Sequence, residues 1–182
     1  HTKLAGALLV HPPGGYQRHP FLERRHGWQA QTRVEQVLSR LDLPADVIHL
    51  DIHYMDGYRV FTWDKKRFPD PPKLIADLAK DGFKTVLIID PGIKVDPKYG
   101  AYSEGKKAGV FIKNPDGSEL NRDVWPKASA FPDFTDPKAR EWFGSLYKVH
   151  LEEGIAGFWN DMNEPGVFMT ERSARPEVVH HP

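Results

Sequence analysis

The chain has 182 residues, with 25 Lys and Arg balanced by 25 Asp and Glu, 40% hydrophobic residues and no cysteine. This composition is typical of a folded domain, and it is too apolar and too weakly charged for a disordered chain. The zero net charge argues against a nucleic-acid-binding protein, and the absence of cysteine excludes a disulfide scaffold, a zinc finger and a thiol nucleophile.

Residues 1–31 show no clear hydrophobic period. The apolar run at residues 4–10 is too short to span a membrane and resembles the core of a secretion signal only weakly. We therefore expect a soluble protein; the sequence does not fix its compartment, and it favours the cytoplasm only slightly over secretion. Residues 11–15 (HPPGG) end any regular element there, so the segment contains at most one strand.

Helical and strand-like patterns alternate from residue 32 onward. Apolar residues at helical spacing predict helices, and short apolar runs predict buried strands. The alternation indicates βαβ units and a parallel sheet. In chain order we predict a helix at residues 32–41, a strand at 46–51, a helix at 71–80, a strand at 83–90, a helix at 137–152 and a strand at 155–161.

Residues 94–135 form a connection that is too long for a simple turn. Two short apolar segments, 110–113 and 118–120, flank the sequence Asn-Pro-Asp-Gly at 114–117. These four residue types favour a tight turn. We therefore predict a β-hairpin insertion after the strand at 83–90, which is the third strand if residues 1–31 supply the first.

An aspartate ends each of three predicted strands: Asp51, Asp90 and Asp161. Parallel strands point the same way, so these carboxylates are expected at the edge where such sheets bind ligands. Taken singly, each aspartate could instead cap a helix or a turn.

The segments that follow these strands are rich in aromatic and thioether side chains. Carboxylates accept hydrogen bonds from sugar hydroxyls, and aromatic rings stack on the CH faces of a pyranose. Core packing is the alternative for each ring. His49 and His53 do not have the spacing of metal ligands beside Asp51, so we expect neither a metal nor a cofactor. The aromatic and thioether residues that could line a sugar site are Tyr54, Met55, Trp63, Trp125, Phe131, Trp159 and Met162.

The sequence Gly-Phe-Trp-Asn-Asp-Met-Asn-Glu-Pro at residues 157–165 resembles the nucleophile motif of glycoside hydrolase family 31, the α-glucosidase and α-xylosidase family. Further stretches resemble the family at residues 51–56, 61–64, 88–92, 124–126 and 130–135. Together they extend over about residues 32–170 in family order.

The resemblance implies a (β/α)8 TIM barrel, of which this chain would supply about the first four βα units. It implies hydrolysis of terminal α-linked glucose with retention, with Asp161 as the nucleophile and an α-glucoside as the substrate. The substrate-binding residues that it implies are Asp51, Ile52, Asp90, Trp125, Trp159 and Met162.

The chain also departs from the family pattern. The family's acid/base, another Asp, lies well downstream of the nucleophile motif, beyond Pro182, and Lys127 stands where the family commonly has Gly. Residues 1–31 match poorly, and residues 171–182 read as a tail at a truncation point. We therefore expect a fragment that is inactive alone and that needs the other half of the barrel or self-associates. The alternative is a non-catalytic carbohydrate-binding or scaffold half-barrel.

Overall fold

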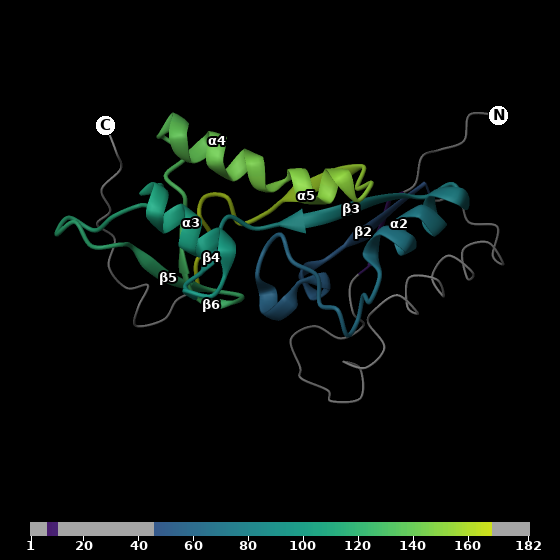
Figure 1. The fold of residues 1–182 in the computed structure, drawn as a ribbon, viewed down its shortest axis with the longest axis horizontal. Coiled ribbons are helices and arrows are strands. Elements are labelled where there is room, and N and C mark those ends of the chain that lie inside the picture. The colour runs from purple at the N-terminus through teal and green to yellow at the C-terminus, as the bar shows by residue number, and fades with distance from the viewer. Residues whose placement is uncertain (1–6, 11–45, 169–182) are drawn as a thin grey trace. The chain divides into compact units, whose positions relative to one another are not determined.

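The computed structural model describes residues 46–168 and the backbone of residues 7–10 (Figure 1). The predicted helix at 32–41 lies outside these residues. The described chain forms two compact units: unit 1 contains residues 7–10, 46–56, 62–88 and 150–159, and unit 2 contains residues 57–61, 89–149 and 160–168. No helix in this described part is long and apolar enough to cross a membrane.

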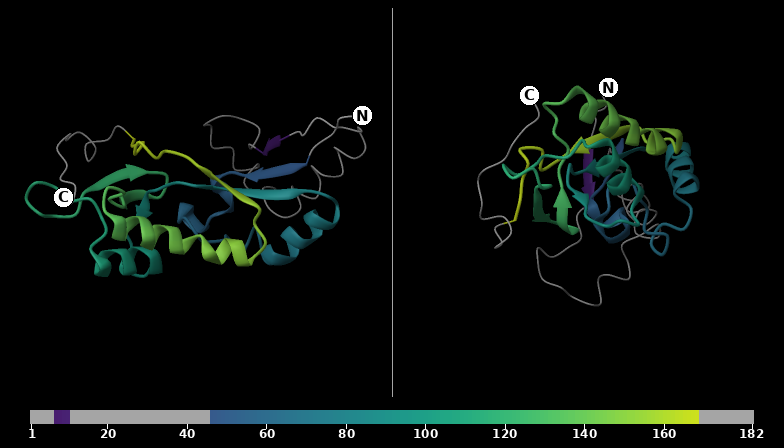
Figure 2. Two further views of the ribbon diagram at one scale, coloured as in Figure 1. Left: turned by 90° about the horizontal axis from the view of Figure 1, so that it is seen from above. Right: turned by 60° about the vertical axis from the view of Figure 1, so that its left-hand side comes forward.

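A parallel sheet has the strand order β1 (Ala7–Val10), β2 (Val47–Leu50), β3 (Lys84–Ile89) and β7 (Gly157–Asn160). Strand β2 pairs in parallel with β1 and with β3, and Figure 2 shows these three strands side by side. The Ala156 N–H donates to the Thr85 carbonyl at 2.9 Å, beside the start of β7. The strands predicted at 46–51, 83–90 and 155–161 are thus confirmed, each with slightly shorter bounds.

Helix α2 (Pro71–Lys80) confirms the predicted helix with the same bounds. Asp70 caps it by accepting a hydrogen bond from the Lys73 N–H at 3.1 Å, and prolines occupy its first turn, where a missing N–H does no harm. The helix stops at Asp81, before Gly82, whose φ of +89° suits glycine. Its apolar face, formed by Leu74, Ile75 and Leu78, is buried.

Unit 2 contains a small antiparallel sheet in the order β4 (Ile93–Lys94), β6 (Lys127–Ala130) and β5 (Asn121–Val124). A short antiparallel pairing forms at the predicted place, where the Leu120 N–H donates to the Ile112 carbonyl at 2.9 Å and the Asn114 N–H to the Ser118 carbonyl at 2.7 Å, but it contains no regular strands. Residues 114–117 do form a turn, with a lone bridge between Lys113 and Glu119 beside it, but the regular hairpin is β5–β6. Helix α3 (Gly100–Ala108), which the sequence pattern did not predict, lies in the same insertion.

The helix predicted at 137–152 is two helices, α4 (Pro137–Leu146) and α5 (Lys148–Glu152), separated by Tyr147. Val149, an apolar residue within the predicted helix, is 44% exposed and is therefore not a core residue. The buried residue of α5 is instead His150. A polar side chain at that position gives no hydropathy signal, so the sequence pattern could not mark it as a core residue.

Taken together, the described strands form an open parallel sheet and a small antiparallel sheet, accompanied by helices. A closed (β/α)8 barrel has eight parallel strands, and four parallel strands are described here. The chain is therefore an α/β protein whose described part does not close a barrel.

Candidate functional site

Asp51 follows β2 directly and begins a single 3-10 turn at Ile52–Tyr54. Its Oδ1 accepts a hydrogen bond from the Ile52 N–H at 2.7 Å, which fixes the carboxylate against the main chain. The Asp51 side chain is half-buried, whereas Ile52 is 6% exposed and belongs largely to the core of unit 1. Asp51 is thus presented at the end of its strand, as the sequence predicted.

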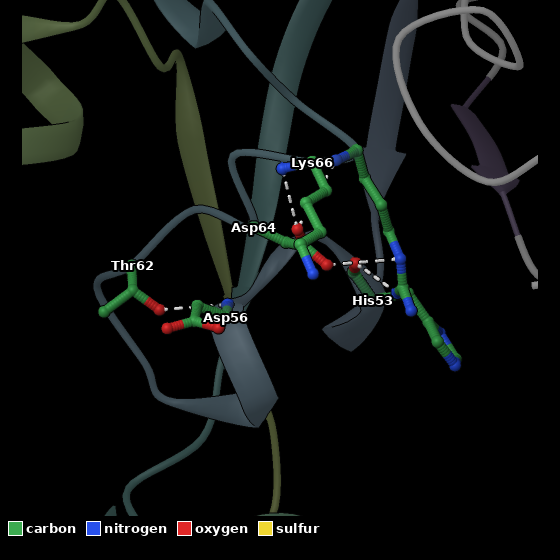
Figure 3. A network of polar contacts seen from close by, with 6 residues as sticks. His53, Asp56, Thr62, Asp64 and Lys66 are labelled. Atoms are coloured by element: carbon green, nitrogen blue, oxygen red, sulfur yellow. Dashed lines mark hydrogen bonds and ion pairs between the residues drawn. The ribbon is translucent and has the colours of Figure 1, made fainter. Parts of the chain in front are cut away.

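Hydrogen bonds to the main chain hold the loop after Asp51 in place (Figure 3). The Asp56 N–H donates to Thr62 Oγ1 at 3.1 Å. The Lys66 N–H donates to Asp64 Oδ1 at 2.9 Å, and Arg67 Nη1 donates to the His53 carbonyl at 3.0 Å. A loop with this many internal bonds on a rigid sheet is a suitable support for a binding residue.

Tyr54, Met55 and Trp63 are core residues, which resolves the choice between packing and sugar stacking. All three are buried, and Trp63 is the most exposed of them at 8%. The Tyr54 hydroxyl donates to the Ile88 carbonyl at 2.9 Å, and Trp63 Nε1 donates to Glu153 Oε2 at 2.8 Å. Their polar atoms are used inside unit 1, so packing is their role.

Asp90 follows β3 directly and is 5% exposed. Gly92 comes close behind it, where an added Cβ would lie 2.7 Å from Val124 Cγ2, so a larger residue would not fit. Burying a carboxylate is costly unless it is hydrogen-bonded, and a buried carboxylate at a strand end is typical of a functional position.

Asp161 follows β7 and is exposed. Its N–H donates to the Ile89 carbonyl at 3.2 Å, and its Oδ1 accepts from the Met162 N–H at 2.9 Å. Met162 has a φ of +57°, a conformation that costs a non-glycine residue about 1–2 kcal/mol. Strain of this kind gathers at functional sites, because the surrounding structure must enforce it.

The side chain of Met162 packs against a buried cluster. The cluster consists of Ile112, Leu120, Val124 and Phe131, and Val167 also packs on it. Phe131 is therefore a core residue and not a sugar platform. Met162, which the family resemblance implies as a substrate-binding residue, thus packs on side chains of the insertion that follows β3.

Trp125 lies at the tip of the β5–β6 hairpin and is half-buried. Its ring centroid lies 5.1 Å from that of Phe168 and 6.2 Å from that of Tyr58, so one part of the indole packs while another stays accessible. Lys127, two residues further along the hairpin, is exposed and has a φ of +74°. This left-handed conformation is the physical reason why glycine suits the position.

The structure places the predicted site residues on elements of both units. Asp51, Ile52 and Trp159 belong to unit 1, whereas Asp90, Trp125, Asp161 and Met162 belong to unit 2. The three aspartates follow strands β2, β3 and β7, which are neighbours in one sheet. Within residues 46–168, no group of three or more His, Asp or Glu side chains is arranged to hold a metal ion.

Sequence reasoning missed Tyr147. Its hydroxyl donates to Asn160 Oδ1 at 2.7 Å, next to Asp161. No motif marks this tyrosine, because it looks like one more residue of an amphipathic helix. No Gly or Pro marks the helix break at Tyr147, so the sequence offers no signal that could have found it.

The family model described as "Glycosyl hydrolases family 31 TIM-barrel domain" matches residues 18–182. The chain is 42% identical to alpha-glucosidase 2 of Bacillus thermoamyloliquefaciens over 183 residues, which are 99% of this chain and 23% of that protein. A solved structure of a family 31 alpha-glucosidase from Bacteroides thetaiotaomicron is 45% identical, with a TM-score of 0.67 over 77% of this chain and 24% of that one.

A crystal structure of the glucosidase II alpha subunit in an alpha3-Glc2-bound form is 36% identical, with a TM-score of 0.78. The likeness covers 85% of this chain and 17% of that subunit. The chain thus spans about a fifth of the length of the relatives that it matches.

Proposed function

The chain belongs to family 31 of the glycosyl hydrolases, and on this basis we propose that it is part of the catalytic domain of a retaining α-glucosidase. Residues 32–170 would form the first half of that domain. The observation that carries the proposal is the nucleophile-like motif at 157–165, which presents Asp161 exposed at the end of a parallel strand.

In this mechanism the Asp161 carboxylate attacks the anomeric carbon of a terminal α-linked glucose. The glycosidic bond breaks, the leaving oxygen takes a proton from a second carboxylic acid, and a glycosyl-enzyme forms. Water then hydrolyses this intermediate, with the second carboxylate acting as base. By family resemblance, that second residue lies downstream of the nucleophile motif. The Met162 N–H supports Asp161 by holding its Oδ1, which orients the other oxygen for attack.

The remaining site residues would bind the sugar. Asp51 and Asp90 would accept hydrogen bonds from its hydroxyls, because ionised carboxylates accept strongly. Trp125 and Trp159 would contact its CH faces, while Ile52 and Met162 would complete the apolar wall. Both tryptophans are half-buried, which leaves ring surface available for a ligand. The related glucosidase II alpha subunit in its alpha3-Glc2-bound form supports α-linked glucose as the substrate class.

The test is to trap the glycosyl-enzyme. The protein made from its complete reading frame is incubated with a fluorinated α-glucoside that forms a long-lived ester, and the label is located by mass spectrometry. We expect the label on Asp161 and none in Asp161→Asn. Glu164→Gln is the matched control, because it removes the neighbouring exposed carboxylate and should still be labelled.

A label on any other residue contradicts the assignment of Asp161. Binding of an α-glucoside without turnover or labelling would favour the non-catalytic carbohydrate-binding alternative. A calorimetric titration with the same glucoside, run beside the labelling experiment, separates these two results.

A further inference from the structure

Asn160 is the residue between Trp159 and Asp161, and its side chain is tied down. It is the last residue of β7 and is exposed, yet its Oδ1 accepts a hydrogen bond of 2.7 Å from the Tyr147 hydroxyl. Tyr147 stands at the break between α4 and α5, outside the motif that contains Asp161. A side-chain hydrogen bond therefore links the helix break to the residue beside the proposed nucleophile.

Two aromatic neighbours hold the Tyr147 ring. Phe61 and Phe143 both meet it edge to face, with ring centroids 5.1 Å and 5.6 Å away. Burial raises the pKa of Tyr147 to about 12, so the phenol stays protonated and keeps its donor proton at neutral and mildly alkaline pH. The Tyr147 hydroxyl is thus a fixed, permanent donor.

The main chain at Asp161 is held on its other sides as well. The Asp161 N–H binds the Ile89 carbonyl at 3.2 Å, and the strained Met162 turn follows. Without the Tyr147 bond, Asn160 would lose its side-chain restraint, and the residue directly before Asp161 would be held less firmly at the end of β7. Nucleophilic attack is sensitive to small displacements of the attacking group.

We propose that Tyr147 is a positioning residue for Asp161 and that it acts through its hydrogen bond to Asn160. The inference rests on the proposed function, because it concerns the rate at which Asp161 attacks. It goes beyond that function by assigning a role to a residue outside the motif. Tyr147 acts through Asn160 and need not touch the substrate.

The experiment measures kcat and KM for an aryl α-glucoside and the rate of labelling by the fluorinated glucoside, in the protein made from its complete reading frame. Tyr147→Phe removes the hydroxyl and keeps the ring contacts. We expect kcat and the labelling rate to fall about three- to tenfold, with KM within about twofold, as for the loss of one hydrogen bond. Tyr102→Phe is the control, because its hydroxyl makes a similar bond, to Glu119 at 2.9 Å.

A double-mutant cycle tests the route through Asn160. We expect Asn160→Ala to slow labelling as much as Tyr147→Phe does, and the double variant to be no slower than either single variant. Thermal unfolding of each variant is compared with Tyr102→Phe, so that loss of stability is separated from loss of rate. Additive effects of the two substitutions would overturn the inference.

The two proposals fail in different ways. Label on Asp161 at an unchanged rate in Tyr147→Phe overturns the positioning role and leaves the proposed function intact. If labelling slows as much in Tyr102→Phe as in Tyr147→Phe, the positioning role is likewise overturned and the proposed function stays intact. Label on a residue other than Asp161 in the unmodified protein overturns the proposed function, and the inference falls with it.

Discussion

The carboxylate of Glu153 joins two buried rings. Its Oε2 accepts from Trp63 Nε1 and lies 2.8 Å from His150 Nδ1. The His150 side chain is fully buried, with the rings of Trp63 and Tyr54 beside it at centroid distances of 5.6 Å and 6.0 Å. A neutral imidazole suits these surroundings, whereas an imidazolium would have to be desolvated.

This environment predicts a pH dependence of stability. Burial lowers the pKa of His150 below 6.5 and outweighs the opposite effect of Glu153. The unfolded chain therefore binds a proton more readily than the folded chain, so stability is complete above about pH 6.5 and falls as the pH drops below it. We expect the free energy of unfolding to decrease more steeply from about pH 7 to pH 5 in the unmodified protein than in His150→Gln. Urea unfolding measures this, and equal slopes would contradict it.

The sequence alone predicted the position or role of some residues but not of others. Asp51, Asp90 and Asp161 were located because each ends an apolar run, which is a local pattern. The role of Trp63 was undecidable from sequence, since its partner Glu153 lies 90 residues away. Lys127 looked like a chemical departure, but its φ of +74° shows a conformational one. Neither a distant partner nor a backbone angle leaves a mark in the local pattern.

At the scale of elements, two helical glycines make a matched pair. A Cβ added at Gly105 in α3 would lie 2.5 Å from Phe111 Cζ and 2.8 Å from Trp142 Cζ2. The same atom added at Gly144 in α4 would have nothing within 4 Å. Both positions would gain helix propensity from alanine, but only Gly144 has room for it.

Alanine at these two positions should therefore have opposite effects on stability. Gly144→Ala should raise the free energy of unfolding by about 0.5–1 kcal/mol, and Gly105→Ala should lower it by about 1–3 kcal/mol because it overpacks two aromatic rings. Urea unfolding of the two variants side by side provides the measurement. A stabilised Gly105→Ala variant would show that Phe111 and Trp142 can move away.

The same helices show why some elements were predictable and others were not. Helix α2 carries its start signal in Asp70-Pro-Pro and its stop signal in Asp81-Gly82, so its bounds were clear. Helix α3 has no side-chain cap and buries chiefly Ala101, Tyr102 and Gly105, two of which are small residues with little hydropathy signal. Its place in the fold comes from close approach to aromatic rings, which sequence periodicity does not register.

At the scale of the whole molecule, the parallel sheet is open. Its outer strands in the described part of the chain are β1 and β7, each paired on one side. Strand edges of this kind present unpaired N–H and C=O groups that favour pairing with another chain. A closed barrel removes such edges, so the fold of these residues is consistent with a larger domain.

The open sheet and the single proposed carboxylate lead to two expectations for a polypeptide limited to residues 1–182. Retaining hydrolysis needs an acid/base beside the nucleophile, and such a group contributes about 10²–10⁴-fold to the rate. We expect this polypeptide to hydrolyse an aryl α-glucoside at least about 10²-fold more slowly than the protein made from its complete reading frame. We also expect light scattering after size exclusion to show self-association through the sheet edges. A stable monomer whose full activity disappears in Asp161→Asn would contradict both expectations, because it would mean that these residues close their own site and carry their own acid.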